Sequence, residues 1–319
     1  SVRCPVKLEA SEFSESAGVT AQSVQKDTVD VKLDHLATVD MQIGAVEAAC
    51  DFDSIIKMFI EPAAAALAEK INREGLALYK DIPYFAGTAG SAPDGLDDLA
   101  NASLALDNLK VPAGVRCAVW DPVAASKLKQ VPAIVNAEKC GSSSALRTGS
   151  VGRVFGIENY MSQAVCSHNV TFSGTLTLSA AAAAESEVTF TVANGSGKIG
   201  KGDIIKIGGK SHTVLEDAPL GESSVKVKLY PAVTAAKDAS AEVIASHTAN
   251  LVFHPNAFAF ITRPLQTPAG VESYVTSYNG ISLRVVRGYD MKYKREILSM
   301  DVLYAFKTVY PELAARYLG

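Results

Sequence analysis

The sequence predicts an α+β protein in which a small all-β domain interrupts a mixed body of helices and strands. Apolar and polar side chains alternate through residues 28–43, which indicates a long strand with one buried face. Apolar side chains recur every three or four positions in residues 62–80 and 94–109, which is typical of amphipathic helices. Short alternating runs separated by turn residues fill residues 167–248 and indicate a small barrel or sandwich.

The long alternating strand is expected to form a two-stranded arm with the N-terminus. Residues 2–9 alternate in the same way, and residues 10–27, rich in Ser, Glu, Gln and Ala, would form the loop between them. At about 3.3 Å per residue the strand would reach roughly 50 Å, far beyond an ordinary strand. Because an isolated two-stranded ribbon is only marginally stable in water, we expect residues 1–46 to project and lie on a neighbouring subunit. The alternative is two edge strands of an ordinary sheet joined by a long loop.

Helices and short strands are expected after the arm. Pro62 is favoured at the first helical position, so the long helix should begin there. Asp94 should cap the second helix, where Asp97 and Asp98 also suit a helix N-terminus better than acid–base chemistry. We expect an earlier short helix at residues 53–59 and a buried strand at residues 115–120. A further helix is expected at residues 123–130, and a bent strand or strand pair at residues 151–162.

The second half of the chain is expected to consist mainly of strands. Inside the inserted domain, short strands are expected at residues 189–192, 203–207, 212–215, 225–229 and 242–244. The mixed body resumes at residue 251. We expect a helix at residues 256–262 and two strands at residues 271–278 and 281–287. A closing strand at residues 297–308 and a terminal turn at residues 311–317 are expected to follow.

Length and composition argue against several classes of protein. The chain has 319 residues, 48% of them hydrophobic, and a formal net charge of −4, which does not fit a disordered or collagen-like protein. Its longest apolar runs, such as residues 63–68, fall far short of the ~20 residues that a membrane-spanning helix needs. Five cysteines without a C-x-x-C pair argue against a disulfide framework or a zinc site and favour reduced thiols. The first residue is Ser and no leader follows it, so we expect the chain to be incomplete at its N-terminus.

The sequence assigns no catalytic, cofactor-binding or metal-binding residue. Residues 195–202 nearly match a phosphate-binding loop, but Gly202 replaces the hydroxyl residue that holds magnesium, and a strand pattern follows. We therefore interpret this stretch as a glycine-rich hairpin turn. None of the five histidines has a partner at a spacing typical of a metal site or a catalytic base. The basic cluster 292–295 is expected to be a solvated strand face, because nucleic-acid binding would need a broader basic footprint.

The order of these parts resembles that of tailed-bacteriophage major capsid proteins with the Hong Kong 97-type fold. It is similar to the coat proteins of short-tailed enteric phages, which carry an inserted β-domain. The local stretches that carry the resemblance are residues 152–157 (GRVFGI), 251–258 (LVFHPNAF), 301–304 (DVLY) and 311–314 (PELA). The resemblance implies an extended β-hairpin arm at residues 1–46 and a peripheral domain with a spine helix at residues 47–112. An axial domain would follow in two halves, residues 113–166 and 249–280, with an inserted β-barrel between them at residues 167–248. Residues 281–319 would supply the closing strands of the peripheral domain and the C-terminus.

The resemblance also implies a structural function rather than an enzymatic one. Copies of the chain would self-assemble into hexamers and pentamers of an icosahedral shell that encloses double-stranded DNA without sequence-specific binding. Scaffolding, portal and decoration proteins are the implied partners, with assembly in the host bacterial cytoplasm and residence in the virion, and no membrane or cofactor is implied. One alternative is an encapsulin-like nanocompartment of the same fold that encloses protein cargo. An enzyme with a β-insertion is a second rival, for which the sequence offers no candidate residues.

Overall fold

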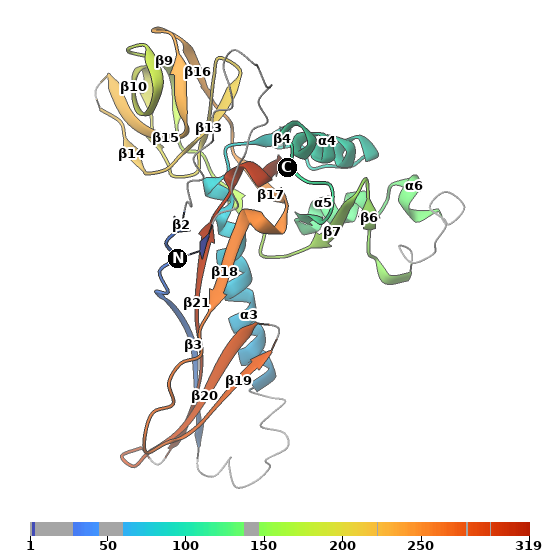
Figure 1. Ribbon diagram of the computed structural model, residues 1–319, viewed down its shortest axis with the longest axis vertical. Coiled ribbons are helices and arrows are strands. Elements are labelled where there is room, and N and C mark those ends of the chain that lie inside the picture. The colour runs from blue at the N-terminus through green and yellow to red at the C-terminus, as the bar shows by residue number, and fades with distance from the viewer. Residues whose placement is uncertain are drawn as a thin grey trace, which may run out of the picture. The chain divides into compact units, whose positions relative to one another are not determined.

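The structure, a computed structural model, describes residues 2–3, 28–44, 60–136, 147–221, 223–278, 280–293 and 295–319 (Figure 1). The chain divides into two compact units. Unit 1 combines Ser1–Leu67 with Ala259–Val309, and unit 2 combines Ala68–Phe258 with Tyr310–Gly319. Unit 1 is built on a five-stranded sheet, whereas unit 2 contains a seven-stranded sheet and a closed barrel.

The sheet of unit 1 has β21 at its centre. Its path runs β18–β21–β20–β19, and β3 pairs with β21 on the side away from β20. The strands are β3 (His35–Gly44), β18 (Phe258–Thr262), β19 (Glu272–Tyr278), β20 (Ile281–Asp290) and β21 (Arg295–Thr308). The last three confirm the strands that alternation predicted in this part of the sequence.

The pairing predicted for the long alternating strand is confirmed at residues 28–29 and is wrong for β3. β3 pairs antiparallel with β21 over all ten of its residues. Among the described residues, the N-terminal strand β1 (Val2–Arg3) pairs with β2 (Thr28–Val29), and residues 30–34 belong to no strand. β21 is the better partner because it adds β3 to a sheet of several strands, whereas a free ribbon is marginally stable. Residues 4–27, which hold the rest of the predicted arm, lie outside the described residues.

The helix predicted at residues 256–262 is also wrong. A single 3-10 turn, Pro255–Ala257, is followed at once by β18. Phe260 of β18 packs on β21, its ring centroid lying 4.7 Å from that of Phe306 and 6.4 Å from that of Tyr304. These cross-strand aromatic contacts favour the extended chain over a weak local helix preference.

Unit 2 contains a seven-stranded sheet covered by helices. The strand order is β4–β22–β17–β5–β7–β6, and β8 pairs with β17. The strands are β4 (Phe85–Gly87), β5 (Arg116–Trp120), β6 (Gly152–Val154), β7 (Ile157–Met161), β8 (Ser167–His168), β17 (His247–Phe253) and β22 (Ala314–Leu318). The terminal turn predicted at residues 311–317 is therefore wrong, because only Pro311–Leu313 form a 3-10 turn before β22 begins.

The helices of unit 2 largely follow the prediction. α3 (Glu61–Leu76), which begins in unit 1, continues as the 3-10 helix η2 (Ala77–Asp81). The further helices are α4 (Leu96–Asn108), α5 (Pro122–Leu128) and α6 (Pro132–Val135). The cap predicted at Asp94 is wrong, because Gly95 is the N-cap. The carboxylate of Asp98 accepts from the backbone N–H of Asp94 at 2.8 Å and from that of Gly95 at 3.1 Å. The short helix predicted at residues 53–59 lies outside the described residues.

The predicted small all-β domain is a closed six-stranded barrel, β10–β15–β13–β12–β16–β9 (Figure 1). Its strands are β9 (Ser173–Leu178), β10 (Ala182–Ser196), β12 (Ile204–Ile207), β13 (Lys210–Val214), β15 (Ser224–Ala235) and β16 (Ser240–Val243). Inward-facing residues such as Phe190, Leu176 and Val227 are almost fully buried and form a core of the barrel's own. Each of the five predicted strands lies in this barrel, whereas β9 was missed.

Candidate functional site

The chain enters and leaves the barrel through two strands that meet at a pair of histidines. β8 leads into the barrel and β17 leads out of it, and His168 lies directly opposite His247 in their antiparallel pairing. Both side chains are buried, and their ring centroids lie 5.3 Å apart. The root of the barrel is therefore formed by two buried imidazole rings, one on each connecting strand.

His168 links the sheet side of this junction to the barrel. Its Nδ1 lies 2.9 Å from Tyr79 Oη in η2, and its Nε2 lies 2.8 Å from Asp203 Oδ1 at the start of β12. A carboxylate can only accept, so Nε2–H donates to Asp203 and Nδ1 accepts from the Tyr79 hydroxyl. Burial raises the pKa of Tyr79 to about 12, which keeps this hydroxyl protonated.

Arg316 of β22 makes the second link between sheet and barrel, and its side chain is fully buried. Its Nη1 donates to the carbonyl of Gly202 at 2.7 Å, and its Nη2 donates to Thr213 Oγ1 at 3.0 Å and to the carbonyl of Lys80 at 3.2 Å. The guanidinium also lies over the Tyr79 ring, 5.2 Å from its centroid. Burial lowers the pKa of Arg316 to about 9, so the group still carries its charge at neutral pH.

His247 is held by one hydrogen bond only within the described part of the chain. Its Nδ1–H donates to the carbonyl of Ala245 at 2.8 Å, and its buried Nε2 has no hydrogen-bond partner there. Burial lowers the pKa of His247 to about 4, and the nearby charge of Arg316 acts in the same direction. The imidazole is therefore neutral at pH 7.

These residues form an enclosed polar junction, which we call the barrel junction: Tyr79, His168, Asp203, Thr213, His247 and Arg316. All six side chains are less than 6% exposed, so the Asp–His–Tyr chain of hydrogen bonds is closed to a substrate. The sequence singled out none of these residues for this role, because they come from five distant stretches and no short motif joins them. The barrel junction connects two parts of unit 2 rather than forming an active site.

Gly202 occupies a position in the barrel junction where a side chain cannot fit. Its φ is +94°, and a Cβ there would lie 2.8 Å from Lys80 Cγ and 3.2 Å from Lys80 Cα. The stretch 195–202 runs from the end of β10 through β11 (Lys198–Ile199) to the turn before β12. The predicted hairpin turn is therefore wrong, because the stretch contains β11, which pairs with β14 (Ala218–Pro219). Gly202 has a packing role that the sequence did not indicate.

Replacing Gly202 by alanine is expected to lower the free energy of unfolding by about 2–4 kcal/mol, from the left-handed backbone and the overpacking together. Gly208, in the β12–β13 turn, provides the matched control: its φ is +56° and its Cβ would meet open space. Gly208→Ala should cost only about 1–2 kcal/mol. Differential scanning calorimetry of both variants checks the difference, and equal shifts in Tm would contradict the close approach at Gly202.

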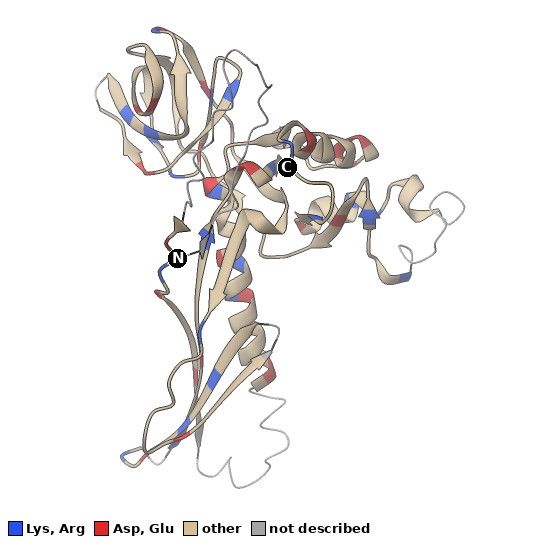
Figure 2. Cartoon of the chain, in the orientation of Figure 1, with Lys and Arg blue, Asp and Glu red and all other residues tan. Residues whose placement is uncertain are grey.

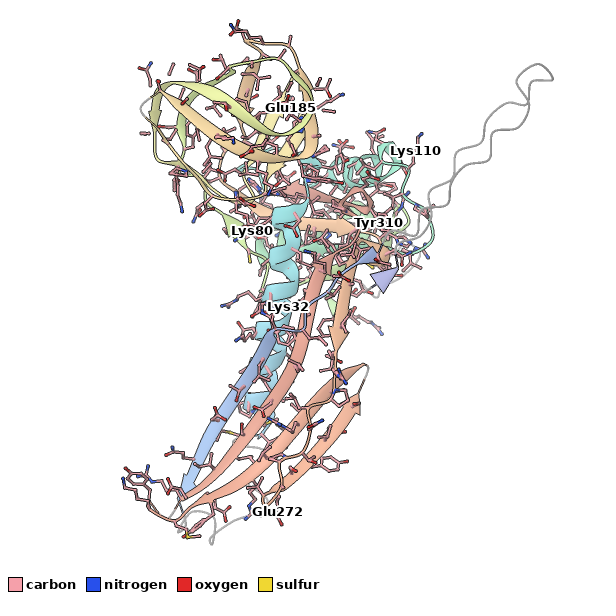
Figure 3. The ribbon with its side chains drawn as sticks, turned by 60° about the vertical axis from the view of Figure 1, so that its left-hand side comes forward. Lys32, Lys80, Lys110, Glu185, Glu272 and Tyr310 are labelled. Atoms are coloured by element: carbon pink, nitrogen blue, oxygen red, sulfur yellow. The ribbon has the colours of Figure 1, made fainter. Side chains whose placement is uncertain are left out.

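The sheet of unit 1 has one apolar and one polar face along β3. Figure 3 shows this strand beside β21 with side chains drawn. On one face Ala37 lies opposite Val302, and Val39 lies opposite Met300. Ala37, Val302 and Met300 are at most 2% exposed, whereas Thr38, Asp40 and Gln42 on the other face are exposed. The face predicted from the period of two is thus confirmed, although its partner strand is different.

Charged residues follow the other strands of this sheet (Figure 2). Arg284 pairs with the buried Asp301 at 2.5 Å, and Arg287 pairs with Glu296 at 2.8 Å. Lys292 and Arg295, from the basic cluster predicted at residues 292–295, are both exposed. Arg295 begins β21 and so confirms the solvated strand face, whereas Lys292 lies in the turn before β21, where the predicted strand is wrong. Lys294 lies outside the described residues.

A cavity of about 280 Å³ beside β5 and β7 offers little for catalysis. Asn159 in its wall is already bonded, accepting from Trp120 Nε1 at 2.8 Å and donating to the carbonyls of Gly152 and Ile157. Within the described residues, no group of three or more His, Cys, Asp or Glu side chains could hold a metal ion. None of the described helices combines the length and apolar character needed to cross a membrane.

Comparison with solved structures identifies the fold. Over 99% of its length the chain is similar to a structure of Mycobacterium phage Che8, covering 83% of that chain, with a TM-score of 0.53 and 16% identity. It is also similar to the capsid of the cyanophage P-SCSP1u, with a TM-score of 0.50 and 14% identity over 98% of this chain and 81% of that one. The chain has a phage capsid fold. The mature capsid of bacteriophage PhiM1 matches in the same way, with a TM-score of 0.50 and 12% identity over 100% of this chain and 82% of that one.

No protein-family model matches the sequence, and no curated protein is found as a relative. Within the phage capsid fold of this chain, the two-faced sheet of unit 1 and the barrel junction of unit 2 are the two features with a functional interpretation.

Proposed function

We propose that this chain is the major capsid protein of a tailed bacteriophage and that it has the Hong Kong 97-type variety of the capsid fold. Its copies would self-assemble into the hexamers and pentamers of an icosahedral shell around packaged double-stranded DNA. The observation that carries this proposal is the likeness to two phage capsid structures over 98% and 100% of the chain. A likeness that spans both units is a stronger argument than a match to either sheet alone.

The barrel supports a finer proposal, that the chain belongs with the coat proteins of short-tailed enteric phages that carry an inserted β-domain. All six barrel strands lie within residues 173–243, inside the segment 167–248 proposed as the insertion. On this proposal residues 47–112 and 281–319 form the peripheral domain, and residues 113–166 and 249–280 form the axial domain. Of residues 1–46, β3 belongs to the sheet of unit 1, and the remainder would form the arm that overlaps a neighbouring subunit.

The edges of the unit 1 sheet suit contacts between copies. Among the described strands β3 and β19 each pair on one side only, so both leave backbone donors and acceptors along a free edge. Neighbouring subunits would cover these edges in a shell. The contacts would be repeated in every copy, so a modest free energy for each would stabilise the whole assembly.

The proposed partners follow from this function. A formal net charge of −4 suits a container that encloses DNA without gripping a particular sequence. Scaffolding, portal and decoration proteins would assemble with the chain in the host bacterial cytoplasm, and the finished shell would form part of the virion.

Negative-stain electron microscopy of the purified, nuclease-treated protein tests the proposal, with absorbance at 260 nm reporting protected DNA. We expect uniform closed shells when the full-length chain is co-expressed with its neighbouring genes. Shells that contain protein cargo and no DNA would instead support the encapsulin-like compartment. Small particles alone, from the full-length chain in that co-expression, would overturn the proposal.

A further inference from the structure

The contact between the barrel and the seven-stranded sheet depends on polar bonds. The apolar core of the barrel draws its residues from the barrel strands and from the segments between them, such as Ile199 and Ala218. A separate cluster fills the sheet side near Leu76 and Leu251. Between them lie the hydrogen bonds of Arg316, the His168–Asp203 pair and the bond from Thr213 Oγ1 to the carbonyl of Lys80 at 2.8 Å. Polar bonds of this kind can open and exchange for water without exposing either core.

A proton on His247 would place a second positive charge beside the buried guanidinium of Arg316. The charged or titratable groups that act on its imidazole are Arg316 on β22, His168 on β8 and Asp203 before β12. Tyr79 and Asp81 act in turn on Arg316, and Cys166 acts on Tyr79. Arg316 and Asp203 supply one positive and one negative charge. A proton on His247 Nε2 would add a second positive charge beside Arg316, at an atom that has no acceptor among the described residues.

We propose that His247 is the acid-sensitive element of a latch, and that its protonation releases the barrel from the seven-stranded sheet while the barrel itself stays folded. The buried imidazole takes up a proton once the junction opens to water, so acid stabilises the open state. The barrel remains intact because its six strands close on one another and its core lies within it. The latch is a property of unit 2 and goes beyond the proposed function.

The expected pH dependence has a definite sign and slope. An exposed histidine has a pKa near 6.5, and burial lowers that of His247 to about 4 in the closed junction. The open state therefore binds the additional proton between these two values. Opening of the junction should increase by up to about tenfold for each pH unit below about 6.5, and should level off near pH 4.

Hydrogen–deuterium exchange of the full-length protein between pH 7.5 and pH 4.5 tests the latch, after correction for the intrinsic pH dependence of exchange. Peptides that contain residues 166–168 and 247–249, whose backbones pair at the root of the barrel, report the junction, and peptides from β10 and β15 report the barrel core. We expect the opening of the junction to rise steeply with acid, while the core strands keep their protection.

Two asparagine variants sharpen the test. In His247→Asn the side-chain amide can still donate to the carbonyl of Ala245, but it cannot take up a proton, so the acid response of the junction should disappear. His212→Asn is the matched control, because His212 is also buried and donates through Nδ1 to the carbonyl of Pro231 at 2.7 Å, but within the barrel. It should keep the full response at the junction.

Two results would overturn the proposal. One is an unchanged acid slope at the junction in His247→Asn. The other needs only the wild-type protein: loss of protection in β10 and β15 together with the junction would mean that acid unfolds the barrel instead of releasing it.

Discussion

Replacing Arg316 by leucine is expected to lower the free energy of unfolding of unit 2 by about 3 kcal/mol. Leucine leaves three buried acceptors without this donor: the carbonyls of Gly202 and Lys80, and Thr213 Oγ1. A buried polar group that loses its partner costs about 1–3 kcal/mol, and removal of the buried charge offsets part of that sum. Urea unfolding followed by the fluorescence of Trp120, the single tryptophan, measures the effect, since this side chain is buried in the core beside the sheet and packs on Tyr317.

Arg287 supplies the control for this experiment. It lies in unit 1, is exposed, and pairs with Glu272 and Glu296. An exposed ion pair contributes at most about 1 kcal/mol, so Arg287→Leu should leave the Trp120 transition almost unchanged. Arg316→Lys should fall between the two, because a single ammonium cannot reach all three acceptors in the geometry of a planar guanidinium. Equal transitions for Arg316→Leu and Arg287→Leu would show that the barrel junction does not stabilise unit 2.

Placing a carboxylate on the buried face of β3 is expected to abolish shell formation. Ala37 is fully buried opposite Val302, and Ala37→Asp would put a charge among apolar side chains. An isolated buried carboxylate costs several kcal/mol, enough to detach β3 from β21. Electron microscopy and sedimentation of the co-expressed protein report the shells, and circular dichroism reports whether the rest of the chain remains folded.

Gln42→Asp adds the same charge to the other face of the same strand. Gln42 is exposed, and its Oε1 accepts from Arg295 Nη1 at 3.1 Å, so an aspartate there would face a cation in water. Shells should form normally in this variant. Shells from Ala37→Asp would mean that the pairing of β3 with β21 is dispensable for assembly.

Strand β3 shows what a periodic pattern can and cannot predict. A period of two defines which side chains share a face, and the side chains of Ala37 and Val39 lie on the face that alternation indicated. The pattern carries no information about which strand lies alongside. That choice depends on β21, more than 250 residues later in the chain, whose own alternation suits many partners.

The barrel was predictable because its strands are neighbours in the sequence. Each strand exposes one face to water, so alternation marks it, and turn residues separate one strand from the next. β22 was missed for the opposite reason: all five of its residues are buried, so both faces are covered and no alternation results. From the sequence alone, Arg316 in that strand would be predicted to lie on the surface, because arginine is almost never fully buried unless it is paired.

The barrel junction could not be predicted from composition or from the local spacing of its residues. His168 and His247 belong to strands at opposite ends of the insertion, and they meet only because the barrel between them closes. Each residue alone is an ordinary histidine. The missing information is long-range distance, which neither composition nor local spacing contains.

The position of β22 between β4 and β17 has a consequence for the order in which the chain folds. The barrel strands form one continuous stretch, so they can close as soon as they leave the ribosome, whereas the seven-stranded sheet must wait for residues 314–318. Until then β17 and β4 present unpaired edges. A barrel that is already closed would keep β8 and β17 together and shorten the effective loop between β5 and β17, which lowers the entropic cost of pairing them. The insertion would thus hold β8 and β17 together in the nascent chain while the seven-stranded sheet is still incomplete.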